Sequence, residues 1–161
     1  STAADGKGFP IAELKDYMPR LVKLVELVGE GRIDDFLELT ETELGREFRT
    51  TDGPFGVDER VEYGRQLDPF RLKPPRFESV DFVGVRRVSS QAYAVVLVGN
   101  SVGGPIHFQF RVYRYQNEWR MLGVDWFTDW REVNYAAFDE PVTYRLSPSP
   151  LSRKPAATTT E

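Results

Sequence analysis

The chain of 161 residues has no cysteine and only one histidine, His107. Without cysteine there is no disulfide bond, no catalytic thiol and no thiolate ligand for a metal ion. One histidine does not make a histidine-based metal cluster. We therefore expect neither a metal site nor a cofactor, and any histidine general base would have to be His107.

Long hydrophobic runs are also missing. No apolar run approaches the roughly 20 residues that a membrane-spanning helix needs, so we expect no membrane span. The chain begins at Ser1 rather than methionine, which fits export after removal of a signal peptide and fits a trimmed chain equally well. The sequence therefore leaves the compartment open.

A strong excess of one charge is absent too, because the net charge is only −4. Residues 1–70 contain 16 acidic and 9 basic residues, whereas residues 71–161 contain 9 acidic and 12 basic ones. The small basic excess of the second half is far below that of nucleic-acid-binding domains, so we expect no nucleic-acid partner.

Hydrophobic residues make up 40% of the chain and aromatic residues 13%, which is typical of a folded domain. We predict one domain over residues 10–146. The small residues of segment 1–9 and the Ser- and Pro-rich segment 147–161 predict disordered ends.

The first half of the chain has helical periodicity. Apolar residues recur at helical spacing between Ile11 and Val28, and Pro19 within this stretch predicts a kink or two separate helices. A second, short helix is predicted over Ile33–Leu39. A third is predicted through Val61 to Leu67, with Asp58 as its N-cap.

The second half alternates with a period of two. Segments 80–85, 92–99, 106–115 and 119–128 predict four strands, and the short links between them predict sequential antiparallel hairpins. The aromatic stretch beyond Asp129 predicts a further helix or an edge strand. Helices followed by a run of strands indicate the α+β class, with the N-terminal helices packed on a strongly curved sheet, as in a cone-shaped α+β barrel.

Three segments carry a resemblance to a known superfamily: Gly29–Phe36, where one helix breaks and the next begins, and the strand segments Phe108–Arg114 and Gln116–Val124. The pattern resembles the superfamily shared by nuclear transport factor 2, ketosteroid isomerase and SnoaL-like polyketide cyclases. The resemblance implies a cone whose open end forms a hydrophobic pocket for a small apolar ligand. Its lining would include Leu24, Phe36, Phe108, Phe110 and Trp126.

The predicted strand 106–115 has two distinct faces. Ile106, Phe108, Phe110 and Val112 make the better core face, so the opposite face carries His107, Gln109, Arg111 and Tyr113. In the superfamily that face often packs on a second subunit, and the resemblance therefore implies a homodimer interface there. A surface or interface role for His107 is favoured over a catalytic one.

Two aspartates are candidates for a catalytic base. Asp125 interrupts an apolar strand and by alternation shares a face with Trp119 and Met121; a carboxylate among aromatics suits acid–base chemistry. The favoured alternative is an ion pair with an arginine on a neighbouring strand, such as Arg111. Asp52 lies where the resemblance implies a pocket aspartate, although an ordinary turn is favoured there.

The tyrosine donor that the resemblance implies on the first helix falls at Leu24, which cannot donate a hydrogen bond. Steroid isomerase activity is therefore not expected. We are left with two hypotheses: a non-enzymatic ligand-binding or protein-interaction module that dimerises through its sheet, or a small-molecule lyase or isomerase that uses Asp125 or Asp52.

Overall fold

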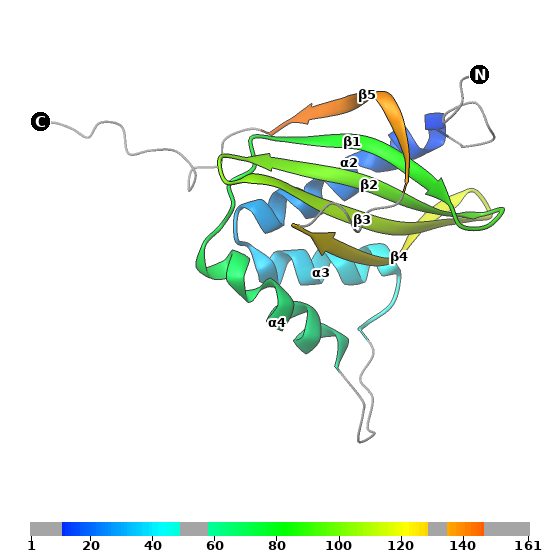
Figure 1. Ribbon diagram of the computed structural model, residues 1–161. Helices are drawn as coiled ribbons and strands as arrows, with labels where there is room; N and C mark the ends of the chain where they lie inside the picture. The colour runs from blue at the N-terminus through cyan, green and yellow to red at the C-terminus, as the bar shows by residue number, and fades with distance from the viewer. Residues whose placement is uncertain (1–10, 49–57, 129–134, 147–161) are drawn as a thin grey trace, which may run out of the picture.

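The computed structural model describes residues 11–48, 58–128 and 135–146. In these residues three helices precede a five-stranded antiparallel sheet, which confirms the α+β class (Figure 1). The helices are α2 (Ile11–Gly29), α3 (Ile33–Leu44) and α4 (Glu59–Leu72). The strands are β1 (Ser79–Arg87), β2 (Ala92–Ser101), β3 (Gly104–Tyr115), β4 (Glu118–Phe127) and β5 (Ala136–Arg145). The predicted disordered ends lie outside the described residues.

Helix α2 runs through Pro19 as one continuous helix, so of the two predicted alternatives, a kink or two separate helices, the second is wrong. Its apolar stripe explains why, because residues on both sides of Pro19 belong to the same buried core. The stripe consists of Leu14, Met18, Leu21, Val25 and Val28. Burial of this stripe outweighs the backbone hydrogen bond that proline cannot make.

The other two helices are longer than predicted. Helix α3 continues past Leu39 to Leu44, where Gly45 ends it in the left-handed conformation with φ of 70°. The predicted N-cap of α4 is confirmed, since the Asp58 carboxylate accepts a hydrogen bond of 3.1 Å from the Val61 amide. This helix also continues past Pro69, where we expected it to end.

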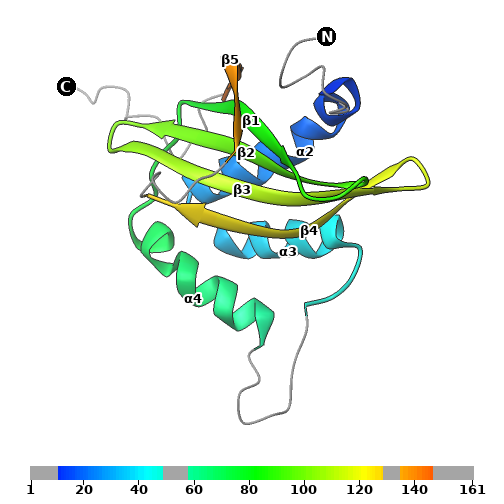
Figure 2. The ribbon, with the colours of Figure 1, turned by 45° about the vertical axis from the view of Figure 1, so that its right-hand side comes forward.

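The strands follow the order β4-β3-β2-β1-β5, and all neighbours are antiparallel. The three predicted hairpins are confirmed, and the stretch after Asp129 supplies an edge strand. Because β4 and β5 lie at opposite edges, the sheet is open and does not close into a barrel. Figures 1 and 2 show α2 and α3 against the same face, which we call the inner face.

Two β-bulges change which side chains share a face. In β1 the register shifts between Phe82 and Gly84, so Val85 joins Val80 and Phe82 in the core instead of facing away from them. In β4 Arg111 pairs with Gly123 while Val112 pairs with Met121, which leaves Leu122 as the extra residue. A strict period of two therefore predicts the wrong relative faces for residues on the two sides of position 83 and of position 122.

Candidate functional site on the outer face of the sheet

The face of the sheet turned away from the helices, the outer face, carries the residues that alternation assigned to it. Gln109 on β3 pairs with Asp125 on β4, and Arg111 pairs with Gly123. Because of the bulge at Leu122, Asp125 lies on the face opposite Trp119 and Met121, contrary to the prediction. One extra residue in β4 thus decides which face of the sheet carries Asp125.

Asp125 forms an ion pair with Arg111 on the neighbouring strand. Nη1 of Arg111 donates a hydrogen bond of 2.6 Å to Oδ2 of Asp125, and the two side chains are 43% and 45% exposed. A Cβ atom at position 123 would clash with the Arg111 guanidinium, so Gly123 provides the space through which the arginine reaches Asp125. The carboxylate is therefore charge-compensated and half-exposed, rather than enclosed among aromatic rings.

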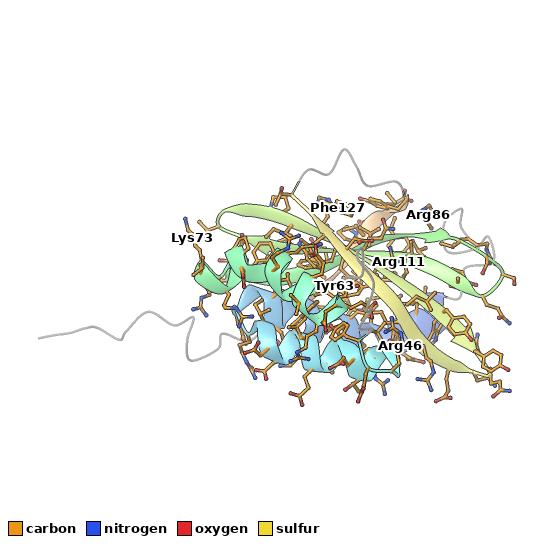
Figure 3. All side chains as sticks on the ribbon, turned by 90° about the horizontal axis from the view of Figure 1, so that it is seen from below. Arg46, Tyr63, Lys73, Arg86, Arg111 and Phe127 are labelled. Carbon is orange, nitrogen blue, oxygen red and sulfur yellow. The ribbon has the colours of Figure 1, made fainter. Side chains whose placement is uncertain are left out.

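Tyr63 from α4 lies close enough to interact electrostatically with both Arg111 and Asp125, and Figure 3 shows Tyr63 together with Arg111. Its ring centroid lies 6.0 Å from that of Trp126 and 5.5 Å from that of Phe48. Burial raises the pKa of the Tyr63 hydroxyl, while the nearby Arg111 guanidinium opposes that change. A tyrosine in this environment stays protonated, so it can donate a hydrogen bond but does not serve as a base near neutral pH.

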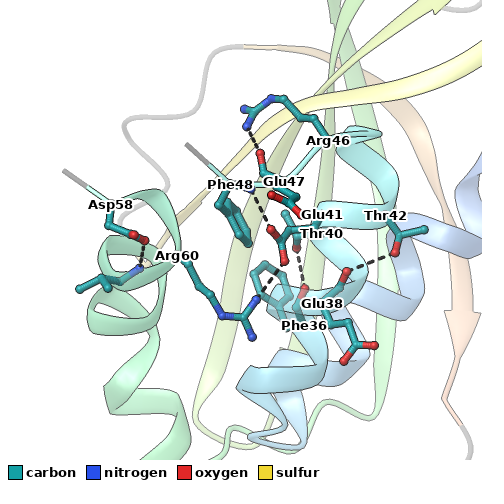
Figure 4. Close-up of polar contacts among 11 residues, drawn as sticks. Phe36, Glu38, Thr40, Glu41, Thr42, Arg46, Glu47, Phe48, Asp58 and Arg60 are labelled. Carbon is teal, nitrogen blue, oxygen red and sulfur yellow. Dashed lines mark hydrogen bonds and ion pairs between the residues drawn. The ribbon is translucent and has the colours of Figure 1, made fainter. Parts of the chain in front are cut away.

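Helix α4, which carries Tyr63, is joined to the end of α3 by polar contacts (Figure 4). The Glu41 carboxylate accepts hydrogen bonds from the Phe48 amide at 2.8 Å and from Arg60 at 3.0 Å. Arg46 forms a second link, with its Nη1 2.9 Å from a Glu59 carboxylate oxygen. These contacts join residues on the two sides of segment 49–57 and hold the start of α4 against the end of α3.

His107 lies on the outer face but is only 5% exposed. Its partner on β2, Val98, is buried, and so are Val96 and Ala94, which pair with Gln109 and Arg111. Burial lowers the pKa of His107, because the interior disfavours the charged imidazolium. The outer face therefore presents little surface over β2, whereas several side chains of β3 and β4 stay accessible.

That accessible part combines both charges with apolar surface. Leu122 is 50% exposed and Tyr115 is 53% exposed, beside the half-buried Tyr113 and the Arg111–Asp125 pair. The Tyr113 and Tyr115 rings are stacked, with centroids 6.1 Å apart. We call these five residues the β3–β4 patch.

The residues predicted to line a pocket lie in the core between helices and sheet. Leu24, Phe36, Phe108 and Phe110 have no exposed surface, and Trp126 packs against them half-buried. A side chain that lined a ligand-sized cavity would keep surface accessible to water. These residues therefore fill the interior, and a ligand would reach them only if the core opened.

A buried polar pair, which sequence reasoning missed, lies at one end of this core. Tyr17 on α2 donates a hydrogen bond of 2.8 Å to Glu43 on α3, and both side chains are buried. Burial, the Glu43 charge and this hydrogen bond all raise the pKa of Tyr17. Arg20 lies 3.6 Å from the Glu43 carboxylate and compensates its charge. The two partners are 26 residues apart, so no local spacing signals the contact.

Two further aspartates bear on a possible site. Asp52 lies outside the described residues. Asp81 accepts hydrogen bonds from Asn100 at 2.9 Å and from Thr143 at 2.6 Å, so it links β1 to the strands on both sides. In the described part of the chain, no three histidine, cysteine, aspartate or glutamate side chains gather as a metal ion would require.

None of the helices in the described segments is long and apolar enough to cross a membrane. No protein-family model, curated protein or solved structure matches this chain. The resemblance to the nuclear transport factor 2 superfamily thus stays a prediction that rests on the residues quoted for it.

Proposed function

We propose that this protein is a non-enzymatic interaction module that forms a homodimer through the β3–β4 patch. The observation that carries the proposal is the half-exposed ion pair between Arg111 and Asp125, surrounded by Tyr113, Tyr115 and Leu122. The resemblance to the nuclear transport factor 2 superfamily implies an interface on the same face of the sheet.

The composition of the patch suits self-association. It holds one positive and one negative charge 2.6 Å apart, so it has no net charge to repel a second copy. Across a two-fold axis, Arg111 of one copy can face Asp125 of the other, and the reverse contact follows by symmetry. Leu122 and the stacked tyrosines supply apolar surface, and aromatic side chains are enriched at protein interfaces.

The alternative, a lyase or isomerase, has less support. Its preferred base, Asp125, is paired with Arg111, and the interior that would hold a substrate is filled by side chains without accessible surface. A general base must lie within hydrogen-bonding reach of the substrate proton. The pairing of Asp125 with Arg111 and the lack of accessible surface in the interior therefore both speak against catalysis.

Sedimentation velocity of the full chain over a range of concentrations tests the proposal. We expect a concentration-dependent monomer–dimer equilibrium. Leu122→Asp should weaken dimerisation by about tenfold or more, which corresponds to ~1.4 kcal/mol, because it places a charge within an apolar contact. A chain that stays monomeric at high concentration would exclude the homodimer.

The matched control is Leu72→Asp at the end of α4, where the leucine is 85% exposed. This variant makes the same chemical change away from the β3–β4 patch, so it should dimerise like the original chain. Equal weakening by both variants would mean that the added charge acts without regard to position, which would contradict the proposed interface.

A further inference from the structure

A cleft lies at one end of the sheet, between the turn that joins β1 to β2 and the turn that joins β3 to β4. Its volume is about 370 Å³, which is within the range of small-molecule sites. The lining residues are Ser90, Gln91, Tyr93, Arg114, Gln116 and Asn117. Figures 1 and 2 both show the two turns side by side, and the Arg114 amide donates a hydrogen bond of 2.9 Å to the Gln91 carbonyl.

Local hydrogen bonds hold both turns in one conformation. In the first turn the Ser89 hydroxyl accepts from the Ala92 amide at 3.1 Å. In the second, Gln116 and Asn117 have φ values of 51° and 65°, as a two-residue hairpin turn of this kind requires. The Asn117 side-chain oxygen accepts a hydrogen bond of 3.0 Å from Arg114 and orients the guanidinium. A cleft held in this way needs little ordering when a ligand binds.

The cleft has a positive charge. Arg114 is the one charged residue of its lining, and the two hairpin ends, residues 86–92 and 113–120, contain four arginines and one glutamate. The Arg114 guanidinium lies 5.9 Å from the centroid of the Trp119 ring, and that of Arg87 lies 5.2 Å from the Tyr93 ring. The two rings are themselves 5.9 Å apart, so both cations rest on one aromatic platform.

We propose that this cleft binds a small hydroxylated anion, namely a sugar acid or a sugar phosphate. The planar guanidinium of Arg114 suits a carboxylate or phosphate group, which it can bind with two parallel hydrogen bonds. The amides of Gln91, Gln116 and Asn117 both donate and accept, which matches the hydroxyl groups of a sugar. An acidic group on the ligand meets no carboxylate in the lining.

The cleft is independent of the proposed dimer interface. Arg114 pairs with Trp119 across the strands, and it alternates along β3 with Tyr113 and Tyr115 of the β3–β4 patch. The two sites therefore lie on opposite faces of the same hairpin. Failure of one proposal leaves the other unaffected, because one is read from ligand binding and the other from sedimentation.

The test is an NMR titration of the isotope-labelled full chain with glucuronate, glucose 6-phosphate, inorganic phosphate and neutral glucose. We expect saturable shifts around Gln91, Arg114 and Asn117 with glucuronate or glucose 6-phosphate, and the tighter of the two identifies the anionic group. Glucose should bind at least about tenfold more weakly, as expected from loss of a hydrogen bond to a charged group. No saturable shift with either sugar anion, or equal binding of glucose, would overturn the proposal.

Three variants sharpen the result. Arg114→Gln should weaken binding of the sugar anion by about tenfold or more. Arg86→Gln makes an equal charge change at an exposed position outside the lining and should leave binding nearly unchanged. Gln91→Ala should weaken binding of the sugar anion but not of inorganic phosphate, because it removes a side chain that would contact the hydroxyl groups. Equal losses in Arg114→Gln and Arg86→Gln would show general attraction to positive charge and contradict a defined site.

Discussion

Arg111 on β3 reaches Asp125 on β4 across Gly123, whose missing side chain leaves room for the guanidinium. The bulge at Leu122 creates this geometry, because it sets Gly123 rather than a larger residue opposite Arg111. The ion pair therefore depends on Gly123 because this residue has no side chain.

Gly123→Ala should displace the Arg111 side chain and separate it from Asp125. The free energy of unfolding should fall by less than about 1 kcal/mol, because a half-exposed ion pair contributes little and the arginine is flexible. If the pair belongs to the dimer interface, the dimer dissociation constant should rise as well. Chemical denaturation measures the stability of the variant, and sedimentation measures its dimerisation. An unchanged dimer dissociation constant would show that the ion pair is not part of the interface.

Gly64→Ala should stabilise the protein. Gly64 lies inside α4, and an added Cβ would meet Leu37 at 3.9 Å, an ordinary contact distance. Alanine loses less backbone entropy than glycine in a helix, so the free energy of unfolding should rise by roughly 0.5–1 kcal/mol. Urea denaturation provides the measurement. A decrease in stability would mean that α4 packs more tightly around Gly64 than the structure describes.

Tyr17→Phe should destabilise the fold by about 1–3 kcal/mol, because it leaves the buried Glu43 carboxylate without its 2.8 Å hydrogen bond. Tyr115→Phe is the control, since it removes a hydroxyl from a side chain that is mostly accessible to water and should change stability by less than about 0.5 kcal/mol. Thermal and urea unfolding compare the two variants. Equal effects would show that the Tyr17 hydroxyl has no special role.

His107 should make stability depend on pH below its unfolded pKa of about 6.5. Burial lowers its pKa in the folded state, so between the two pKa values the unfolded chain binds more protons. The contribution is fully present above about pH 6.5 and is lost as the pH falls below it, by at most ~1.4 kcal/mol per pH unit for one proton. The chain has no other histidine, which makes the attribution clean.

Urea unfolding at pH 7.5 and pH 5.5, for the original chain and for His107→Gln, measures this dependence. The original chain should lose more stability than the variant over this interval. Because carboxylates titrate in both proteins, the difference between the two slopes is the quantity to compare. Parallel slopes would show that His107 protonates equally well in the folded and unfolded states.

The sequence predicted those elements whose signals are local. Alternation predicted four of the five strands and their hairpins, and the Asp58 cap was confirmed at 3.1 Å from the Val61 amide. The continuity of α2 and the end of α4 were predicted less well, because Pro19 and Pro69 are tolerated inside these helices. In α2 the buried stripe on both sides of the proline offsets the lost hydrogen bond. The low helix propensity of a single proline does not reveal how strongly tertiary packing favours the helix around it.

The candidate sites depended on contacts between distant residues. Alternation assigned Arg111 to the outer face of the sheet, but Asp125 changed faces because Leu122 is an extra residue in β4. A bulge is invisible to a pattern with a period of two, since it becomes evident only when a partner strand defines the register. The Tyr17–Glu43 pair and the cleft beside Arg114 likewise join residues from different elements.

The sequence alone was enough to predict the α+β class, the order of helices before strands and the absence of cysteine chemistry. Three features follow only from the tertiary contacts: Leu24, Phe36, Phe108 and Phe110 lie fully buried in the core, the bulge at Leu122 brings Asp125 to the face of Arg111, and a positively charged cleft forms between two hairpin turns. Hydrophobic periodicity in the sequence reports which face of a helix or strand is apolar, whereas packing and strand register decide which side chains come into contact.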